Sequence, residues 1–170
     1  MNTSTDAFEV QGFMPAAGLA ILRDLAADKR VLEIGCWKGR TALAMAAVAN
    51  CVWTVDHFRG DAYTGKAYTL PEAWENLRAA GNVRVLAGPF EEIMLGLDLA
   101  WFEVLFYDAD HDYEPTRRFL ELAVERSIDA TLVVDDYSPA YPQVMQAVHE
   151  FFPARSIRVE GALAILRKRP

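Results

Sequence analysis

The sequence predicts an α/β fold: a doubly wound, mainly parallel seven-stranded sheet with a C-terminal antiparallel hairpin. Five short apolar segments have the composition of buried parallel strands, at residues 31–35, 52–56, 83–88, 101–110 and 131–137. Segments with helical character separate them, at residues 14–27, 41–50, 69–81, 90–95, 115–126 and 143–152. The tail continues as two strands around Glu160 and Gly161, which predict a tight turn. Repeated strand–helix units with right-handed crossovers place helices on both faces of the sheet.

Local signals mark the ends of these helices. Pro15 is tolerated in the first turn of the first helix, and Thr69 with Glu72 forms a capping-box pattern before the third. Gly81 and Pro153 follow helical segments and are typical residues beyond a helix end. The pattern therefore predicts where each helix begins or ends as well as its place in the order.

Length and composition favour one globular domain spanning residues 1–170, with residues 1–9 as a polar, frayed lead-in. The chain is 52% hydrophobic and 24% charged, as ordinary soluble domains are. A net charge of −7 argues against nucleic acid or an anionic membrane surface as the main partner. No apolar run is long enough to span a membrane, and Asp6 and Glu9 make the N-terminus unlike a signal peptide. We therefore expect a cytoplasmic protein.

Ligands of such sheets bind beyond the carboxyl ends of the strands, at the switch point of strand order. Gly35 and Gly39 follow the first strand, where they let the backbone approach a ligand and open a helix whose free amides can hold a carboxylate. Asp56 ends the second strand, where a carboxylate can accept both hydroxyls of a ribose. His57 and Phe90 stand where they could line an adenine pocket. A plain tight turn and a solvated aspartate are the structural alternatives.

A second group of polar residues follows the fourth and fifth strands. Asp108 ends the fourth strand, and Asp135 and Asp136 end the fifth, so the three carboxylates should converge. Carboxylates so close repel each other unless a cation neutralises them, and an all-oxygen site favours Mg²⁺ or a similar divalent ion. His111 has a side chain suited to general-base chemistry near neutrality. Helix capping by the acids and an exposed loop histidine are the alternatives.

Several segments resemble known motifs. The segment VLEIGCWKGRTALAMA resembles motif I of class I S-adenosylmethionine (SAM)-dependent methyltransferases, and VWTVDHF resembles motif II with its ribose acid. The segment FYDADHDYEPTRRFLELA, followed by VVDDYSP, is similar to a metal-linked O-methyltransferase subgroup. The short stretch at residues 11–14, before the first helix, is also similar to that subgroup. This subgroup includes catechol- and caffeoyl-CoA-type enzymes and, closer in pattern, macrolide sugar O-methyltransferases and cephalosporin-hydroxylase-like proteins of the Methyltransferase 24 type.

The resemblance implies a Rossmann-like fold, SAM as cofactor, and a divalent cation such as Mg²⁺. It implies cofactor-binding residues at Glu33, Gly35, Trp37, Gly39, Thr41, Asp56, His57, Phe90 and Asp108. It further implies metal ligands at Asp108, Asp135 and Asp136, and catalytic roles for His111 as base and for Asp108. The expected partner is a hydroxylated small-molecule methyl acceptor.

The chain lacks the N-terminal extensions with which many relatives cover the acceptor, which predicts an open site or one completed in a homo-oligomer. Residues 59–68 are the candidate lid. Three other functions remain: a non-catalytic domain that binds SAM or S-adenosylhomocysteine, a nucleotide-dependent oxidoreductase, and a metal-dependent hydrolase. The oxidoreductase is disfavoured because Trp37 and Arg40 interrupt the Gly-x-Gly-x-x-Gly pattern, and the hydrolase leaves motif I without a role.

Overall fold

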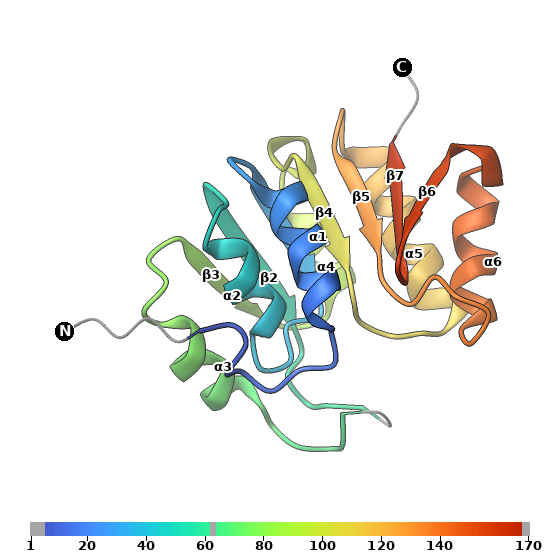
Figure 1. Cartoon of the computed structure of the whole chain (residues 1–170). Helices are drawn as coiled ribbons and strands as arrows, with labels where there is room; N and C mark the ends of the chain where they lie inside the picture. Colours follow the sequence, from blue (N-terminus) through green and yellow to red (C-terminus); the bar gives the residue numbers. More distant parts are fainter. Residues whose placement is uncertain (1–5, 62–63, 168–170) are drawn as a thin grey trace.

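The computed structural model describes residues 6–61 and 64–167, and it has the fold that the sequence predicts (Figure 1). Seven strands form a sheet in the order β3-β2-β1-β4-β5-β7-β6. The strands are β1 (Arg30–Ile34), β2 (Cys51–Asp56), β3 (Val83–Ala87), β4 (Val104–Tyr107), β5 (Thr131–Val134), β6 (Ile157–Glu160) and β7 (Leu163–Arg167). Strands β1 to β5 pair in parallel, and β7 pairs antiparallel with β5 and β6.

Helices cover both faces of this sheet. They are α1 (Ala16–Ala26), α2 (Arg40–Ala46), α3 (Leu70–Leu77), α4 (Phe90–Gly96), α5 (Tyr113–Arg126) and α6 (Pro142–Phe151), with short 3₁₀ turns at Leu99–Trp101 and Ala154–Ser156. Because successive side chains of a strand point to opposite faces, β4 contributes side chains to two hydrophobic cores, one on each face of the sheet. Val104 and Phe106 pack with α1, α2 and α3, whereas Leu105 and Tyr107 pack with α4, α5 and α6. The sheet is therefore buried on both sides.

The strand order reverses beside β1. From β1 the chain proceeds outward to β2 and β3, then returns to β4 on the other side of β1. The connection after β1 leads to α2 on one face, and the connection after β4 leads to α5 on the other. Connections that leave in opposite directions open a crevice at the carboxyl ends of the two strands.

Three local predictions differ from the structure. Strand β4 is shorter than predicted, because a 3₁₀ turn precedes it and leaves Trp101 40% exposed. Helix α5 begins at Tyr113, before Pro115, which sits in the first turn where a missing N–H does no harm. The capping box at Thr69 was wrong: its side chain makes no capping hydrogen bond, and its backbone is already helical at φ −101° and ψ −4°.

The N-terminal lead-in is partly packed. Residues 1–5 of the predicted frayed segment lie outside the described residues, but Ala7 and Val10 are buried with 8% and 3% of their surface exposed. Both belong to the core beneath α1 and α2. Across the described residues, no helix has both the length and the apolar character needed to cross a membrane.

Candidate active site

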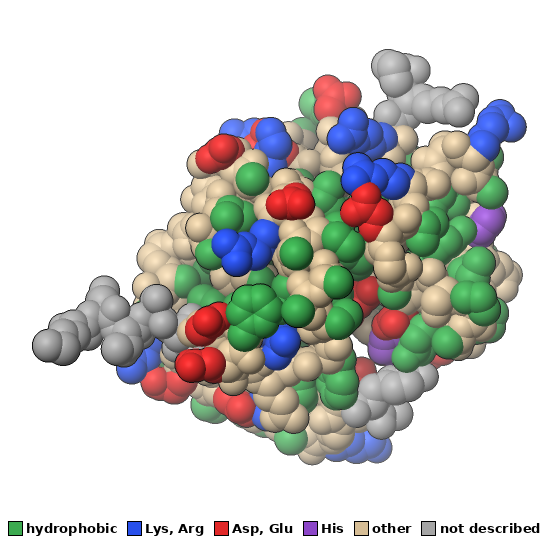
Figure 2. Space-filling view, viewed as in Figure 1, with side chains coloured by type: hydrophobic (Ala, Val, Ile, Leu, Met, Phe, Trp, Pro, Cys, Tyr) green, Lys and Arg blue, Asp and Glu red, His purple; other side chains and the backbone are tan. Residues whose placement is uncertain are grey.

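A cavity of about 510 Å³ opens at the carboxyl ends of the parallel strands. Its walls come from the loops after β1, β2, β4 and β5, the start of α1 and the tip of the β6–β7 hairpin. In Figure 2 a histidine lies beside acidic side chains in the lower right of the view, while other acidic side chains are spread over this face. The predicted site residues that line it are Gly35, Trp37, Thr41, Asp56, His57, Phe90, Asp108, His111, Asp135 and Asp136.

The loop after β1 depends on two glycines with left-handed backbone. Gly35 has φ +97°, and a Cβ there would lie 1.8 Å from the carbonyl oxygen of Asp108. Only glycine lets the loop after β1 approach the end of β4 this closely. Gly39 has φ +89°, but a Cβ there would meet Leu77 of α3 at 2.8 Å, and Gly39 does not line the cavity. Gly35 thus shapes the cavity, while Gly39 makes room for α3.

Asp56, at the end of β2, holds the same loop. Its Oδ2 accepts hydrogen bonds from the backbone amides of Cys36 at 3.0 Å and Trp37 at 2.7 Å. Its Oδ1 accepts from the amide of Phe58 at 2.6 Å. A carboxylate offers about four acceptor positions, so these bonds leave capacity for a ligand hydroxyl. The side chain is only 14% exposed and faces the cavity.

Glu33 lies beneath the loop instead of in the cavity. Its side chain is completely buried on β1, and the hydroxyl of Thr54 donates a 2.5 Å hydrogen bond to Oε2. Burial raises the pKa of Glu33 to about 7 because it disfavours the charged form. Glu33 therefore does not line the cavity, although its charge acts on Asp108, which does.

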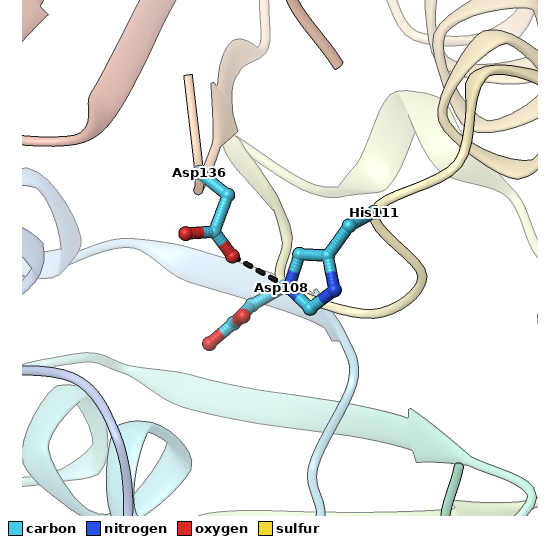
Figure 3. A group of neighbouring side chains, drawn as sticks. All are labelled: Asp108, His111 and Asp136. Carbon is cyan, nitrogen blue, oxygen red and sulfur yellow. Dashed lines mark ion pairs between the residues drawn. The ribbon is translucent and has the colours of Figure 1, made fainter. Parts of the chain in front are cut away.

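Asp108, His111 and Asp136 form the carboxylate–histidine group (Figure 3). One potential ligand atom from each lies within 4.8 Å of the other two. The Nε2 of His111 is 2.5 Å from Oδ2 of Asp136, and the ring of Tyr141 stacks on His111 at 4.7 Å. Asp136 adopts a left-handed backbone with φ +56°, which is uncommon outside glycine. Asp135 lines the cavity beside this group but is not one of its three members.

Crowding of these carboxylates shifts their proton affinity. Burial, together with repulsion from Asp135 and Asp136, raises the pKa of Asp108 well above its ordinary value. Burial also raises the pKa of Asp135 to about 6. The hydrogen bond to Asp136 raises the pKa of His111, because an adjacent carboxylate stabilises the imidazolium. The group therefore favours bound cations, whether protons or a metal ion.

A family model described as a methyltransferase domain matches residues 32–137, which is more than half of the chain. The chain belongs to this methyltransferase family. The matched region contains the loop after β1, Asp56 and the whole carboxylate–histidine group. No curated protein sequence matches this methyltransferase.

Solved structures share the methyltransferase fold. Cofactor-bound Rv0187 from MTB is 23% identical with a TM-score of 0.70, over 98% of this chain and 87% of that one. The O-methyltransferase NovP is 21% identical with a TM-score of 0.71, over 89% and 79%. An O-methyltransferase from Bacillus cereus, in complex with SAH, is 15% identical with a TM-score of 0.60, over 90% and 84%. The seven-stranded sheet is therefore the methyltransferase sheet.

Several cavity-lining residues of the methyltransferase were not anticipated as site residues. They are Phe13, Met14, Ala17 and Ile21 at α1, Arg40 after β1, Asp110 after β4, Tyr141 after β5, and Glu160 to Leu163 at the hairpin tip. The similarity of residues 11–14 to the subgroup was the one sequence signal for the α1 wall. Nothing local indicated the hairpin tip, which reaches the cavity only through the pairing of β7 with β5.

Two further predicted features occupy the rim. His57 is half exposed, and its Nδ1 accepts a 3.0 Å hydrogen bond from the amide of Arg59. In the candidate lid at residues 59–68, positions 62 and 63 lie outside the described residues, while Asp61 and Thr64 line the cavity. The amide and hydroxyl of Thr64 donate hydrogen bonds to Oδ1 of Asp61 at 2.7 and 2.9 Å.

Proposed function

We propose that this methyltransferase transfers the methyl group of SAM to a hydroxyl oxygen of a small molecule, and that residues 1–170 form one catalytic domain. The observation that carries the proposal is a single cavity with two chemically different ends. One end is the glycine loop and Asp56, and the other is the carboxylate–histidine group. Methyl transfer needs a cofactor and an acceptor held in line, so positioning in one cavity supplies most of the rate.

The cofactor end offers what SAM requires. Asp56 has acceptor capacity for a ribose hydroxyl, and Phe90 and His57 border the same part of the cavity. Thr41 and the loop after β1 face the position that we assign to the methionine part. The structural relatives that contain cofactor, SAH or, in TomG, SAM are consistent with this assignment.

The acceptor end fits a divalent cation. Two carboxylate oxygens and an imidazole nitrogen lie close together here, from Asp108, Asp136 and His111. Repulsion among the acids favours the binding of a cation. We propose these three as ligands, with Asp135 beside them. Because one donor is imidazole, Mn²⁺ suits the group at least as well as Mg²⁺, which prefers oxygen. A bound divalent ion lowers the pKa of a neighbouring hydroxyl and orients it.

If His111 is not a metal ligand, we propose that it acts as a general base. Its ion pair with Asp136 and its stacking on Tyr141 hold the ring in place at the acceptor end. In that arrangement the imidazole of His111 accepts the proton of the acceptor hydroxyl, and Asp136 stabilises the imidazolium that results. Asp108 remains available to bind the hydroxyl by a hydrogen bond. The two roles differ in one measurable respect, namely whether turnover depends on a metal.

The test is calorimetric titration of SAM into the protein with and without Mg²⁺ or Mn²⁺. We expect micromolar SAM binding, at least tenfold weaker binding in Asp56→Ala, and little change in Asp135→Asn. With a hydroxylated acceptor, Asp135→Asn should lose turnover more than cofactor affinity. Unchanged SAM affinity in Asp56→Ala would contradict the ribose assignment. Absence of SAM binding by folded protein would refute the function.

A further inference from the structure

Part of the cavity lining is apolar. Met14, Ala17 and Ile21 line the cavity from α1, and Leu163 lines it from the hairpin. Phe13 stands at the rim with 72% of its surface exposed and stacks on Trp37 with ring centroids 5.0 Å apart. An apolar wall with an exposed aromatic rim receives an apolar or ring-like body better than a polyhydroxylated sugar, which needs many hydrogen-bond partners.

Acidic side chains outside the carboxylate–histidine group also line the cavity. Asp110 and Glu160 line the cavity in addition to Asp135. Burial, followed by repulsion from Asp61, raises the pKa of Asp110. Asp110 and Glu160 thus add acidic groups to the cavity lining beyond those that we assign to the cation.

Positive side chains are nearly missing from the lining. Among the described residues that line the cavity, Arg40 is the single lysine or arginine. It is the first residue of α2, and its Nη1 donates a 2.7 Å hydrogen bond to the carbonyl of Val10. Arg158 pairs with Glu160 on β6 but does not itself line the cavity. A phosphate or carboxylate on an acceptor would thus meet several acids and a single cationic side chain, Arg40, which already bonds to the carbonyl of Val10. This balance is unfavourable for an anion in a confined site.

We propose that the acceptor of this enzyme is an uncharged or positively charged molecule that carries its hydroxyl on an apolar, ring-like body. The proposal rests on the proposed methyl transfer and narrows its substrate class. The apolar face of the acceptor packs against α1 and Leu163, and its hydroxyl points to the carboxylate–histidine group. Nucleotide-linked sugars, acyl-CoA thioesters and phenolic acids are disfavoured because their negative charges meet Asp110 and Glu160.

Three catechols with the same ring and a similar side-chain length separate charge from shape. Dopamine carries an ammonium group, hydroxytyrosol a neutral hydroxyl and homoprotocatechuate a carboxylate. With SAM and Mn²⁺, we expect kcat/KM for dopamine and hydroxytyrosol to exceed that for homoprotocatechuate at least tenfold. If none of the three is turned over, each is titrated calorimetrically into protein saturated with S-adenosylhomocysteine. We then expect the Kd of dopamine and of hydroxytyrosol to be at least tenfold lower than that of homoprotocatechuate.

Charge variants test whether the cavity lining causes the preference. Glu160→Lys should reduce the ratio of kcat/KM for dopamine to kcat/KM for homoprotocatechuate at least threefold. Glu125→Lys is the matched control, because it makes the same change in net charge on an exposed residue of α5 that does not line the cavity. If this ratio of kcat/KM values shifts equally in both variants, the preference reflects the overall charge of the protein. That result would overturn the assignment of the preference to the cavity lining.

Equal or better use of homoprotocatechuate, or failure of all three catechols to bind the saturated protein, overturns the proposed acceptor class. Failure of S-adenosylhomocysteine to bind appears in the first titration and counts against methyl transfer itself. The two failures are therefore distinguishable.

Discussion

Replacing Glu33 by glutamine should stabilise the protein at alkaline pH and have little effect in acid. Glu33 is completely buried, and its pKa is raised to about 7 from an ordinary 4.5. The folded state therefore holds this proton over a range in which the unfolded chain has lost it. Stability from this group is fully present below the unfolded pKa and is lost as the pH rises through 7.

The magnitude follows from the shift. A displacement of 7 − 4.5 = 2.5 units corresponds to about 3 kcal/mol at pH 8, taking 1.36 kcal/mol per unit. Glutamine has the same shape, carries no charge and can still accept the hydrogen bond from Thr54. We expect Glu33→Gln to exceed the parent in unfolding free energy by up to about 3 kcal/mol at pH 8 and by much less at pH 4.5.

Urea unfolding at the two pH values measures this difference, and Glu125→Gln on exposed α5 provides the control. The control should show no pH-dependent gain. Because Glu33 does not line the cavity, SAM affinity should change little in Glu33→Gln. A variant that is destabilised equally at both pH values would refute the reasoning, since the buried carboxylate would then be fully compensated when ionised.

Three further outcomes are expected. Gly35→Ala should lose several kcal/mol of stability in urea unfolding, because a Cβ at φ +97° has no room beside Asp108. The control Gly65→Ala, at φ +81° with no atom within 4 Å of the added Cβ, should lose only about 1 kcal/mol. Similar losses in the two variants would argue against the close contact with β4. Phe13→Ala should accelerate cofactor release about three- to tenfold in stopped-flow measurements by removing the stack on Trp37, and Phe8→Ala, at a residue 52% exposed, should not. Chelation by EDTA should abolish turnover and Mn²⁺ should restore it, while full activity after chelation would assign His111 to proton transfer alone.

The sequence was sufficient for the sheet because apolar runs and their order determine which strands are parallel and where their ends meet. Asp56, Asp108 and Asp136 lie at one edge for that reason. The roles within the acidic pair could not be predicted. Asp135 and Asp136 are adjacent in the sequence, and the left-handed φ of +56° at Asp136 determines which carboxylate meets His111.

Long-range contacts account for the other differences. Motif position predicts that Glu33 is a cofactor-binding residue; the structure places its carboxylate in the interior, where Thr54 of β2 donates a hydrogen bond to it. The acceptor wall at Leu163 depends on the antiparallel pairing of β7 with β5, far away in the sequence. Neither contact has a local pattern that periodicity or spacing could reveal.

Hydrogen bonds and backbone packing connect the two ends of the cavity. Asp56 of β2 holds the amides of Cys36 and Trp37, and Gly35 in the same loop lies against the carbonyl of Asp108 at the end of β4. A shift of the cofactor loop must therefore move Asp108 or break these contacts, because packed backbone has little room to yield. In a reaction whose rate depends on the alignment of methyl donor and acceptor, such coupling lets one glycine set the distance between both substrates. Side chains introduced at Gly35 should for this reason impair turnover even in variants that still bind SAM and fold.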